Sequence, residues 1–354
     1  MTNNLEELNN LEEKIVYKSV FEMQEYVYGA PNINVGSLKK ILSLDAILQE
    51  NEQIESKALA VTNEQTSGIR MRFYTTSPKV RFKLHTSRKY PLQNVISTGA
   101  FGFDFYFIES SGLKKHITVM TQNVPNNDID YELSLFGKPR NIEIYFPSYT
   151  AILDMVIGIE EGSTICQCTV PYRNKSQILF YGNSCTQGAS ASRSGNAYPN
   201  IVSRKLDCDI VNYSFSAACR AEQAMAQSII DNAEKNNSDI GAIVIDYQRN
   251  AASLTEFYER YEPFYYKFRN KYPTIPIILI GATMQPIYGK FIKEFHRKCK
   301  LKNENTFYID LDQLFCNLDS ISLTPDRLHY TDEGMFLIAD KICDYILQSS
   351  SCIN

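Results

Sequence analysis

The chain has 354 residues, 44% hydrophobic and 21% charged, so it can build roughly two globular domains with ordinary cores. A formal net charge of −4, with no long basic run, gives no reason to expect a nucleic acid partner. No window holds the roughly 18 apolar residues of a membrane helix, and the polar start MTNNLEELNN is unlike a secretory signal. We therefore expect a soluble cytoplasmic protein without a membrane partner.

The nine cysteines and four histidines do not form a recognisable metal-binding pattern. Cys166 and Cys168 are too closely spaced for the usual zinc pair, and no second pair follows. We expect reduced, mostly buried thiols and no metal site.

The N-terminal part divides into two stretches of different periodicity. Helical spacing from about residue 5 to 27 predicts an N-terminal helical segment within residues 1–30. Residues 31–170 then contain short alternating runs separated by turn residues, such as VRFKLHT at 80–86 and NIEIYFPSY at 141–149. This pattern predicts an antiparallel β-sandwich domain.

From residue 171 to 354, apolar strands alternate with long amphipathic stretches. QILFY, DIVNYSF, AIVIDYQ, PIILIGA and TFYIDLDQLF each precede a segment with helical spacing. Five such units predict an α/β domain whose parallel sheet is covered on both faces. Ligands bind at the carboxyl ends of such strands, which is where Ser184 follows QILFY.

Ser184 and Cys185 lie side by side between Gly182 and Gly188, and either could be a nucleophile, or the stretch could be a simple turn. A serine needs a base, and the base needs an orienting acid. His329 is the best candidate base, because Asp326 precedes it by three residues in a polar loop. His85, His116 and His296 fit structural or surface roles better.

An acyl-transfer site also needs donors for a developing oxyanion. Candidates are a backbone N–H at the Ser184 turn, another in the loop around Ser216 and Ala217, and the side chain of Asn250. By itself, Asn250 fits a turn or a helix cap equally well.

The chain resembles the SGNH (GDSL-type) hydrolases in four blocks that occur in the expected order: YGNSCTQG, YSFSAAC, DYQRN and PDRLH. The match extends from about residue 176 to 347. The branch with a short sandwich domain in front is the most similar, because SGIRMRF and GFDFY look like recurring phrases of that domain. The resemblance implies a flavodoxin-like three-layer α/β/α domain after a jelly-roll-like sandwich.

The resemblance also implies roles. Ser184 would be the nucleophile, His329 the general base and then acid, and Asp326 the residue that orients His329. The N–H groups of Ser184 and Ala217 and the side chain of Asn250 would form the oxyanion hole. No metal or organic cofactor is implied.

The implied activity is that of a serine esterase acting on a small-molecule acyl ester, in the first place an O-acetyl group on a carbohydrate or similar polar metabolite. An acyltransferase with the same triad and a non-catalytic binding protein are the alternatives. The sandwich would present substrate, complete the active-site wall or support a homo-oligomer.

Three positions depart from the family pattern. Asn183 replaces the frequent aspartate, Ala217 a glycine and Gln248 another glycine. An alanine tolerates positive φ less well than a glycine, so the Ala217 N–H could be misaligned. The family places an apolar residue at the position of Cys185, which predicts that this thiol packs under the turn. We also consider Arg220 and Gln248 as substrate contacts, with a surface role equally open for Arg220.

Overall fold

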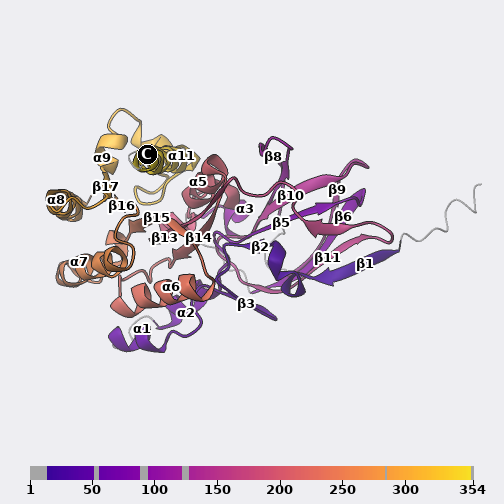
Figure 1. The fold of residues 1–354 in the computed structure, drawn as a ribbon, viewed down its shortest axis with the longest axis horizontal. Helices are drawn as coiled ribbons and strands as arrows, with labels where there is room; N and C mark the ends of the chain where they lie inside the picture. The colour runs from indigo at the N-terminus through magenta and orange to yellow at the C-terminus, as the bar shows by residue number, and fades with distance from the viewer. Residues whose placement is uncertain (1–13, 52–55, 88–94, 122–126, 284, 352–354) are drawn as a thin grey trace, which may run out of the picture.

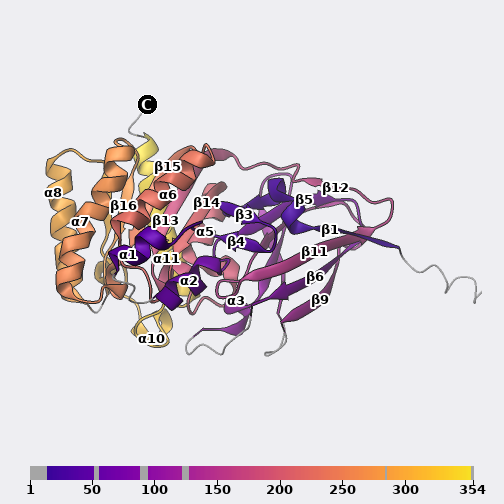
Figure 2. The ribbon, with the colours of Figure 1, turned by 90° about the horizontal axis from the view of Figure 1, so that it is seen from below.

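The computed structural model describes residues 14–51, 56–87, 95–121, 127–283 and 285–351. The molecule is elongated, with the sandwich at one end of the long axis and the α/β half at the other (Figures 1 and 2). This arrangement places the carboxyl ends of the α/β strands within reach of loops from the sandwich.

The α/β half is built on a five-stranded sheet in the order β14-β13-β15-β16-β17. All of its strand pairs are parallel. The strands are β13 (Asn174–Gly182), β14 (Cys208–Ser214), β15 (Ile240–Asp246), β16 (Ile277–Ile280) and β17 (Thr306–Ile309). Each of the five predicted strand runs forms one of them.

Helices cover both faces of this sheet, as the apolar strands predict. In β13, Ile178 and Phe180 pack in the core shared with α5 (Tyr198–Leu206) and α11 (Asp332–Ser351). Leu179 and Tyr181 point to the other face, which is covered by α6 (Gln223–Lys235), α7 (Leu254–Lys271) and α8 (Pro286–Leu301). The predicted three-layer α/β/α domain is confirmed.

The sandwich consists of two antiparallel sheets. One has the order β1-β11-β6-β9, and the other β12-β5-β10-β7-β8, with β2 paired to β5. The first contains β1 (Ile15–Ser19), β6 (Lys79–Thr86), β9 (Asp128–Ser134) and β11 (Ile152–Glu160). The second contains β2 (Val27–Tyr28), β5 (Arg70–Thr75), β7 (Phe103–Ile108), β8 (Lys114–Met120), β10 (Arg140–Tyr145) and β12 (Ile165–Gln167). The alternating side chains Val80, Phe82 and Leu84 are buried between the sheets, as predicted.

The prediction of a helix over residues 5–27 is wrong for its described part. Residues 15–19 form β1, which pairs antiparallel with β11, and two 3-10 turns follow at Val20–Glu22 and Gln24–Tyr26. Ile15 and Tyr17 are partly buried while Val16 and Lys18 are exposed, so the effective period here is two. Residues 1–13 of the predicted helical segment lie outside the described residues.

Part of the predicted sandwich, residues 31–64, is not built of sandwich strands: Leu38 still packs in the sandwich core, whereas Ile41, Ile47 and Leu59 pack in the core of the α/β half. This segment forms a small hairpin of β3 (Asn32–Asn34) and β4 (Ser37–Lys39), then α1 (Asp45–Glu50) and α2 (Ser56–Glu64). Helix α1 lies against α6, and Ile47 and Leu59 belong to the same buried cluster as Tyr213 of the sheet (Figure 2). The prediction of one sandwich over 31–170 therefore needs correction here, while its predicted end falls between β12 and β13.

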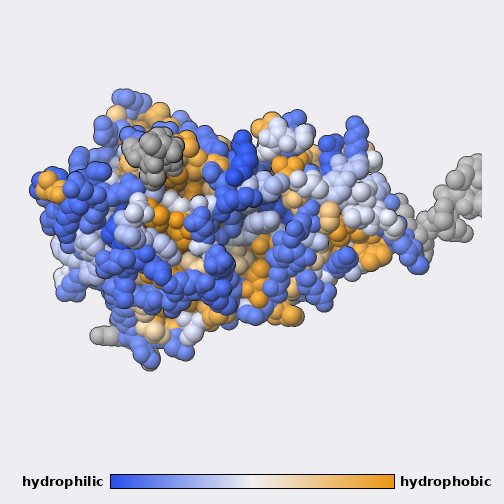
Figure 3. Space-filling view, in the orientation of Figure 1, coloured by the Kyte–Doolittle hydropathy of each residue, from blue (hydrophilic) through white to orange (hydrophobic). Residues whose placement is uncertain are grey.

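Further features concern the helices, the cysteines, possible metal ligands and the surface. Among the described residues, none of the helices is both long and apolar enough to cross a membrane. The eight cysteines in the described part of the chain are free thiols. In the same part, no group of His, Cys, Asp and Glu side chains is arranged to hold a metal ion. On the face shown in Figure 3, hydrophobic areas are separated by hydrophilic side chains.

Candidate active site

The candidate residues meet at one edge of the parallel sheet. Gly182 at the end of β13 pairs in register with Ser214 of β14 and Asp246 of β15. The segments carrying Ser184, Ala217 and Asn250 therefore leave three adjacent strands at the same end. The loop before the last helix, α11, brings His329 to the same edge of the sheet.

A tight turn presents Ser184 at the start of the short helix α4 (Ser184–Gln187). The side chain of Asn183 caps this helix by accepting a hydrogen bond from the Cys185 N–H at 2.8 Å. Local geometry requires a glycine at each of the two flanking positions. A Cβ on Gly182 would lie 1.9 Å from Thr186 Oγ1, and Gly188 ends the helix at φ +103°.

The structure brings Ser184, His329 and Asp326 into one hydrogen-bonded chain. Ser184 Oγ lies 2.8 Å from His329 Nε2, and His329 Nδ1 lies 2.7 Å from Asp326 Oδ2. The serine and histidine side chains are partly buried and remain accessible. This is the connectivity that a nucleophile, a base and an orienting acid require.

The Asp326 carboxylate is held by its own turn. Its Oδ1 accepts hydrogen bonds from the backbone N–H groups of Leu328 at 2.9 Å and His329 at 2.8 Å. Burial by itself would raise the pKa of Asp326, but these bonds and the His329 side chain outweigh it, so the pKa lies below its usual value. The acid therefore stays ionised, as an orienting carboxylate must.

Cys185, the neighbour of Ser184, points into the protein interior. Its side chain is fully buried, and Sγ donates to the Leu328 carbonyl at 3.4 Å. Burial raises the pKa of the Cys185 thiol to about 12. A thiol in this state is not a nucleophile at neutral pH, so the prediction that Cys185 packs under the turn is confirmed.

Residues 215–218, which follow β14, form the predicted oxyanion loop. Its Phe215 N–H donates to the Gly182 carbonyl at 2.9 Å, which ties the loop to the nucleophile turn. Ala217 has φ +59°, the left-handed conformation that favours the family's glycine. The chain thus keeps the glycine-type backbone with an alanine in place, at an intrinsic cost of about 1 kcal/mol.

A buried carboxylate supports the nucleophile turn from below. Asn183 Nδ2 donates to both the carbonyl and Oδ1 of Asp246, each at 3.0 Å. Thr186 Oγ1 donates to Asp246 Oδ2 at 3.2 Å. Burial raises the pKa of Asp246, and the nearby Arg249 opposes that shift.

The remaining predicted site residues occupy the same region; Gln248 and Arg220 have protein partners, whereas Asn250 Oδ1 is buried without a hydrogen bond to any of the described residues. Asn250 ends the 3-10 turn Gln248–Asn250 directly after β15 and is partly buried. Gln248 is buried and donates to the Gly281 carbonyl at 3.3 Å. Arg220 is buried in an ion pair with Glu256, with Nε 3.0 Å from Oε1, which does not fit a surface role. Their contact with a substrate stays a prediction.

The other histidines hold structural positions. His85 and His116 lie in the sandwich. His85 Nδ1 lies 2.7 Å from Asp128 Oδ1, and His116 Nε2 lies 2.8 Å from Asp104 Oδ1. His296 in α8 contacts the Thr306 carbonyl at 3.1 Å. None of the three is part of the Ser184–His329 chain.

Sequence reasoning missed several residues that support the site. Tyr149, from the sandwich loop after β10, donates its hydroxyl to the Ser184 carbonyl at 3.2 Å. Arg249 donates to the Tyr330 hydroxyl at 2.7 Å, next to His329. The Gln187 side chain bridges the two halves of the molecule. Gln187 and Arg249 lie within the family-like blocks YGNSCTQG and DYQRN. Tyr149 lies far from these blocks in the sequence, so no catalytic motif pointed to it.

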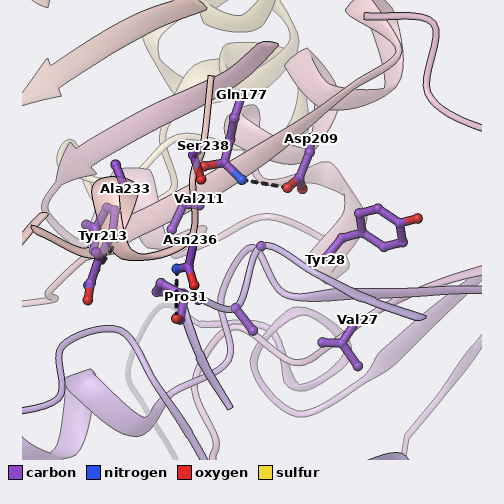
Figure 4. A pocket seen from close by; sticks show the side chains of 13 residues that line it. Val27, Tyr28, Pro31, Gln177, Asp209, Val211, Tyr213, Ala233, Asn236 and Ser238 are labelled. Carbon is purple, nitrogen blue, oxygen red and sulfur yellow. Dashed lines mark hydrogen bonds between the residues drawn. The ribbon is translucent and has the colours of Figure 1, made fainter. Parts of the chain in front are cut away.

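A polar cavity of about 280 Å³ lies along β14 and reaches the start of β13; none of Ser184, Asp326 and His329 lines it (Figure 4). Gln177 and Asp209 line it, and their side chains hydrogen-bond each other at 2.6 Å. Six residues lie between Gln177 and Ser184, which in an extended chain corresponds to roughly 20 Å. The cavity is therefore distinct from the triad.

Two family models match the chain. Residues 175–347 match the GDSL-like lipase/acylhydrolase family, and residues 44–165 match the N-terminus of SGNH-hydrolase-type esterases. No curated protein matches the chain.

Solved structures share the whole two-part architecture. A protein of Bacteroides ovatus ATCC 8483 described as a GDSL-like lipase is 23% identical, with a TM-score of 0.77 and coverage of 96% of this chain and 98% of that one. The salicylyl-acyltransferase SsfX3 of a tetracycline biosynthetic pathway is 15% identical, with a TM-score of 0.69 and coverage of 97% and 96%. A family two carbohydrate esterase from Clostridium thermocellum is 13% identical, with a TM-score of 0.57 and coverage of 80% and 92%. At these identities the likeness establishes the fold.

Proposed function

The chain belongs to the GDSL-like acylhydrolase family of SGNH-type esterases, and on that premise we propose that it hydrolyses a small acyl ester by way of a covalent acyl-serine. The observation that carries the proposal is the unbroken chain from Ser184 through His329 to Asp326, with distances of 2.8 and 2.7 Å. The substrate class we favour is an acetyl ester of a carbohydrate or similar polar metabolite. The fold that the chain shares with family two carbohydrate esterases supports that choice.

In the first half-reaction, Ser184 Oγ attacks the acyl carbon while His329 Nε2 takes the hydroxyl proton. The carbonyl oxygen becomes an oxyanion, which the Ser184 and Ala217 N–H groups and the Asn250 side chain would stabilise. Collapse of this intermediate breaks the ester C–O bond, and His329 gives its proton to the leaving alcohol. Asp326 stabilises the imidazolium while it carries the extra proton.

In the second half-reaction, water attacks the acyl-serine. His329 takes a proton from the water and then returns a proton to Ser184 Oγ, which releases the carboxylic acid. The buried Cys185 takes no part in either half-reaction.

The first test is acetate release from p-nitrophenyl acetate by the wild type, Ser184→Ala and Cys185→Ala. We expect Ser184→Ala to lose activity by about 10³-fold or more, because the nucleophile is removed. Cys185→Ala should keep activity within roughly tenfold, because the change only removes a buried thiol. Far-ultraviolet circular dichroism checks that each variant is folded. An active Ser184→Ala, or a folded Cys185→Ala as inactive as the serine variant, would contradict the assignment.

The same acyl-serine could pass its acyl group to an alcohol or amine, and the architecture shared with a salicylyl-acyltransferase motivates this second candidate. The test is to repeat the assay with sugar or amine acceptors. If the transfer product exceeds the free acid, the protein is an acyltransferase instead of a hydrolase.

A further inference from the structure

We propose that Gln187 is a positioning residue through which the sandwich holds the oxyanion loop, so that the docked sandwich is part of the catalytic apparatus. Gln187 ends helix α4, three residues after Ser184, and its side chain is fully buried. This inference rests on the proposed function, because it assigns the residue that orients one of the donors used there.

The Gln187 amide joins the two halves of the molecule. Its Nε2 donates to Gln65 Oε1 at 2.5 Å and to the Ser148 carbonyl at 3.0 Å. Its Oε1 accepts from the Ser216 N–H at 3.0 Å. Gln65 follows α2 and Ser148 lies in the loop between β10 and β11, so both precede the α/β half in the chain.

The orientation of this amide is fixed by its partners. The Ser148 carbonyl can only accept a hydrogen bond, so it must face the NH₂ group. The Ser216 N–H can only donate, so it must face the amide oxygen. Both Nε2 hydrogens and the oxygen are therefore used, and the side chain has one arrangement that satisfies all three neighbours.

The oxyanion loop is a segment that needs such a restraint. Ala217, directly after Ser216, has φ +59°, a conformation that an alanine adopts against its intrinsic preference. The direction of the Ala217 N–H depends on that conformation, because the backbone angles of residues 216 and 217 set it. By fixing Ser216, Gln187 fixes the residue immediately before the donor.

A second sandwich residue acts at the same place. The Tyr149 hydroxyl donates to the Ser184 carbonyl at 3.2 Å. Gln65 Nε2 donates in turn to the Tyr149 carbonyl at 3.3 Å. Tyr149 thus holds the Ser184 turn directly, whereas Gln65 and Ser148 hold the oxyanion loop through Gln187.

The test is steady-state esterase kinetics of Gln187→Met, a substitution of similar size that removes all three hydrogen bonds. We expect kcat to fall roughly 10- to 100-fold with KM changed less than about threefold, because an oxyanion donor acts in the transition state. The shape of the pH–rate profile should stay as in the wild type, because Ser184, His329 and Asp326 are untouched. Adding Ala217→Gly to this variant should recover several-fold in kcat, because a glycine adopts the left-handed conformation without a restraint.

Gln177→Met is the matched control. Gln177 lies near the start of β13, the strand that leads into α4, and also donates to an interface residue, Asp209. It should keep the wild-type kcat. If Gln177→Met loses as much kcat as Gln187→Met, the effect is loosened domain packing, and the proposal is overturned.

Three further results decide the matter. A folded Gln187→Met with wild-type kcat overturns the inference alone, whereas a wild type without Ser184-dependent turnover overturns the proposed function and the inference with it. If Gln187→Met does not fold, the milder Gln65→Met decides. That variant should lose kcat by a few-fold with an unchanged melting temperature, and a wild-type kcat would count against the proposal.

Discussion

At the scale of single residues, Asn183 explains how this chain departs from the family pattern without losing the turn. Its amide oxygen accepts from the Cys185 N–H, while its NH₂ group donates twice to Asp246. An aspartate at this position could make the first contact but would need a proton to make the second. The asparagine thus fits a turn that rests on a buried carboxylate.

We predict that Asn183→Asp destabilises the protein more at pH 8 than at pH 5. The new carboxyl would face Asp246 in a buried site, so the pair would keep one proton in the folded state with a raised pKa. The unfolded chain releases that proton at lower pH, so the free energy of unfolding of the variant falls, relative to the wild type, as pH rises. Urea unfolding of both proteins at the two pH values measures the effect, expected at about 1–3 kcal/mol at pH 8.

Asn305→Asp is the control for this prediction. Asn305 donates to the Thr274 carbonyl at 2.9 Å in a solvent-accessible position. The Asn305→Asp variant should show a much smaller change of its unfolding free energy with pH. An equal slope in both variants would show that the Asp246 contact is not its cause.

At the scale of elements, the end of strand β14 depends on a buried lysine from the N-terminal hairpin. Lys40 follows β4, and its ammonium group donates to the Thr62 and Ser214 carbonyls, both at 2.7 Å. Ser214 is the last residue before the oxyanion loop. Burial lowers the pKa of Lys40 to about 7. The segment between the sandwich strands β2 and β5 thus also supports this loop.

This burial has a consequence for stability against pH. The folded protein releases the Lys40 proton near pH 7, while the unfolded chain keeps it to about pH 10.5. Between these values the unfolded state binds more protons, so stability rises with pH. We predict that the wild type gains unfolding free energy relative to Lys40→Met from pH 7 to 9, by at most about 1.4 kcal/mol per pH unit.

The measurement is chemical denaturation of both proteins at several pH values. Lys39→Met, at the neighbouring and more exposed lysine, is the matched control and should give no such slope. A constant difference between the wild type and Lys40→Met would contradict the prediction.

At the scale of the whole molecule, a buried ionic network joins the sandwich to the α/β half. Glu143 of β10 is fully buried, with Oε1 3.9 Å from Arg70 Nε and Oε2 3.4 Å from Lys114 Nζ. Arg70 also pairs with Asp209, and Lys114 lies 3.4 Å from Asp207, so the network crosses the interface. Burial alone would raise the pKa of Glu143, but Lys114, Arg72 and Arg70 outweigh it and lower the pKa.

We predict that Glu143→Gln lowers the free energy of unfolding by about 3–5 kcal/mol, because it leaves buried cations without their shared counter-charge. Since the folded pKa of Glu143 is lowered, its contribution is present at neutral pH and is lost as pH falls through that value. Glu132→Gln is the control, because its pair with Arg81 is exposed and should contribute less than about 1 kcal/mol. Calorimetry of both variants measures the difference, and equal melting temperatures would contradict the prediction.

The sequence by itself determined the two-part architecture and the chain of catalytic candidates. Period-two runs and continuous apolar strands depend on local burial, so they predicted both β-regions. Ser184, Asp326 and His329 could be found because each lies in a short block whose residue types are tied to acyl-transfer chemistry. The same local logic failed at residues 15–19, because a helical spacing of apolar residues competes with strand pairing that only β11 can supply.

Only the tertiary structure decided what surrounds those residues. Tyr149 and Gln65 are remote from Ser184 in sequence, and hydrogen bonds between distant segments leave no periodic signal. The packing of α1 and α2 on the α/β sheet, and the left-handed Ala217, likewise follow from contacts across the fold. Local composition fixes which residues could react, whereas the docking of the sandwich on the sheet fixes how their donors are held.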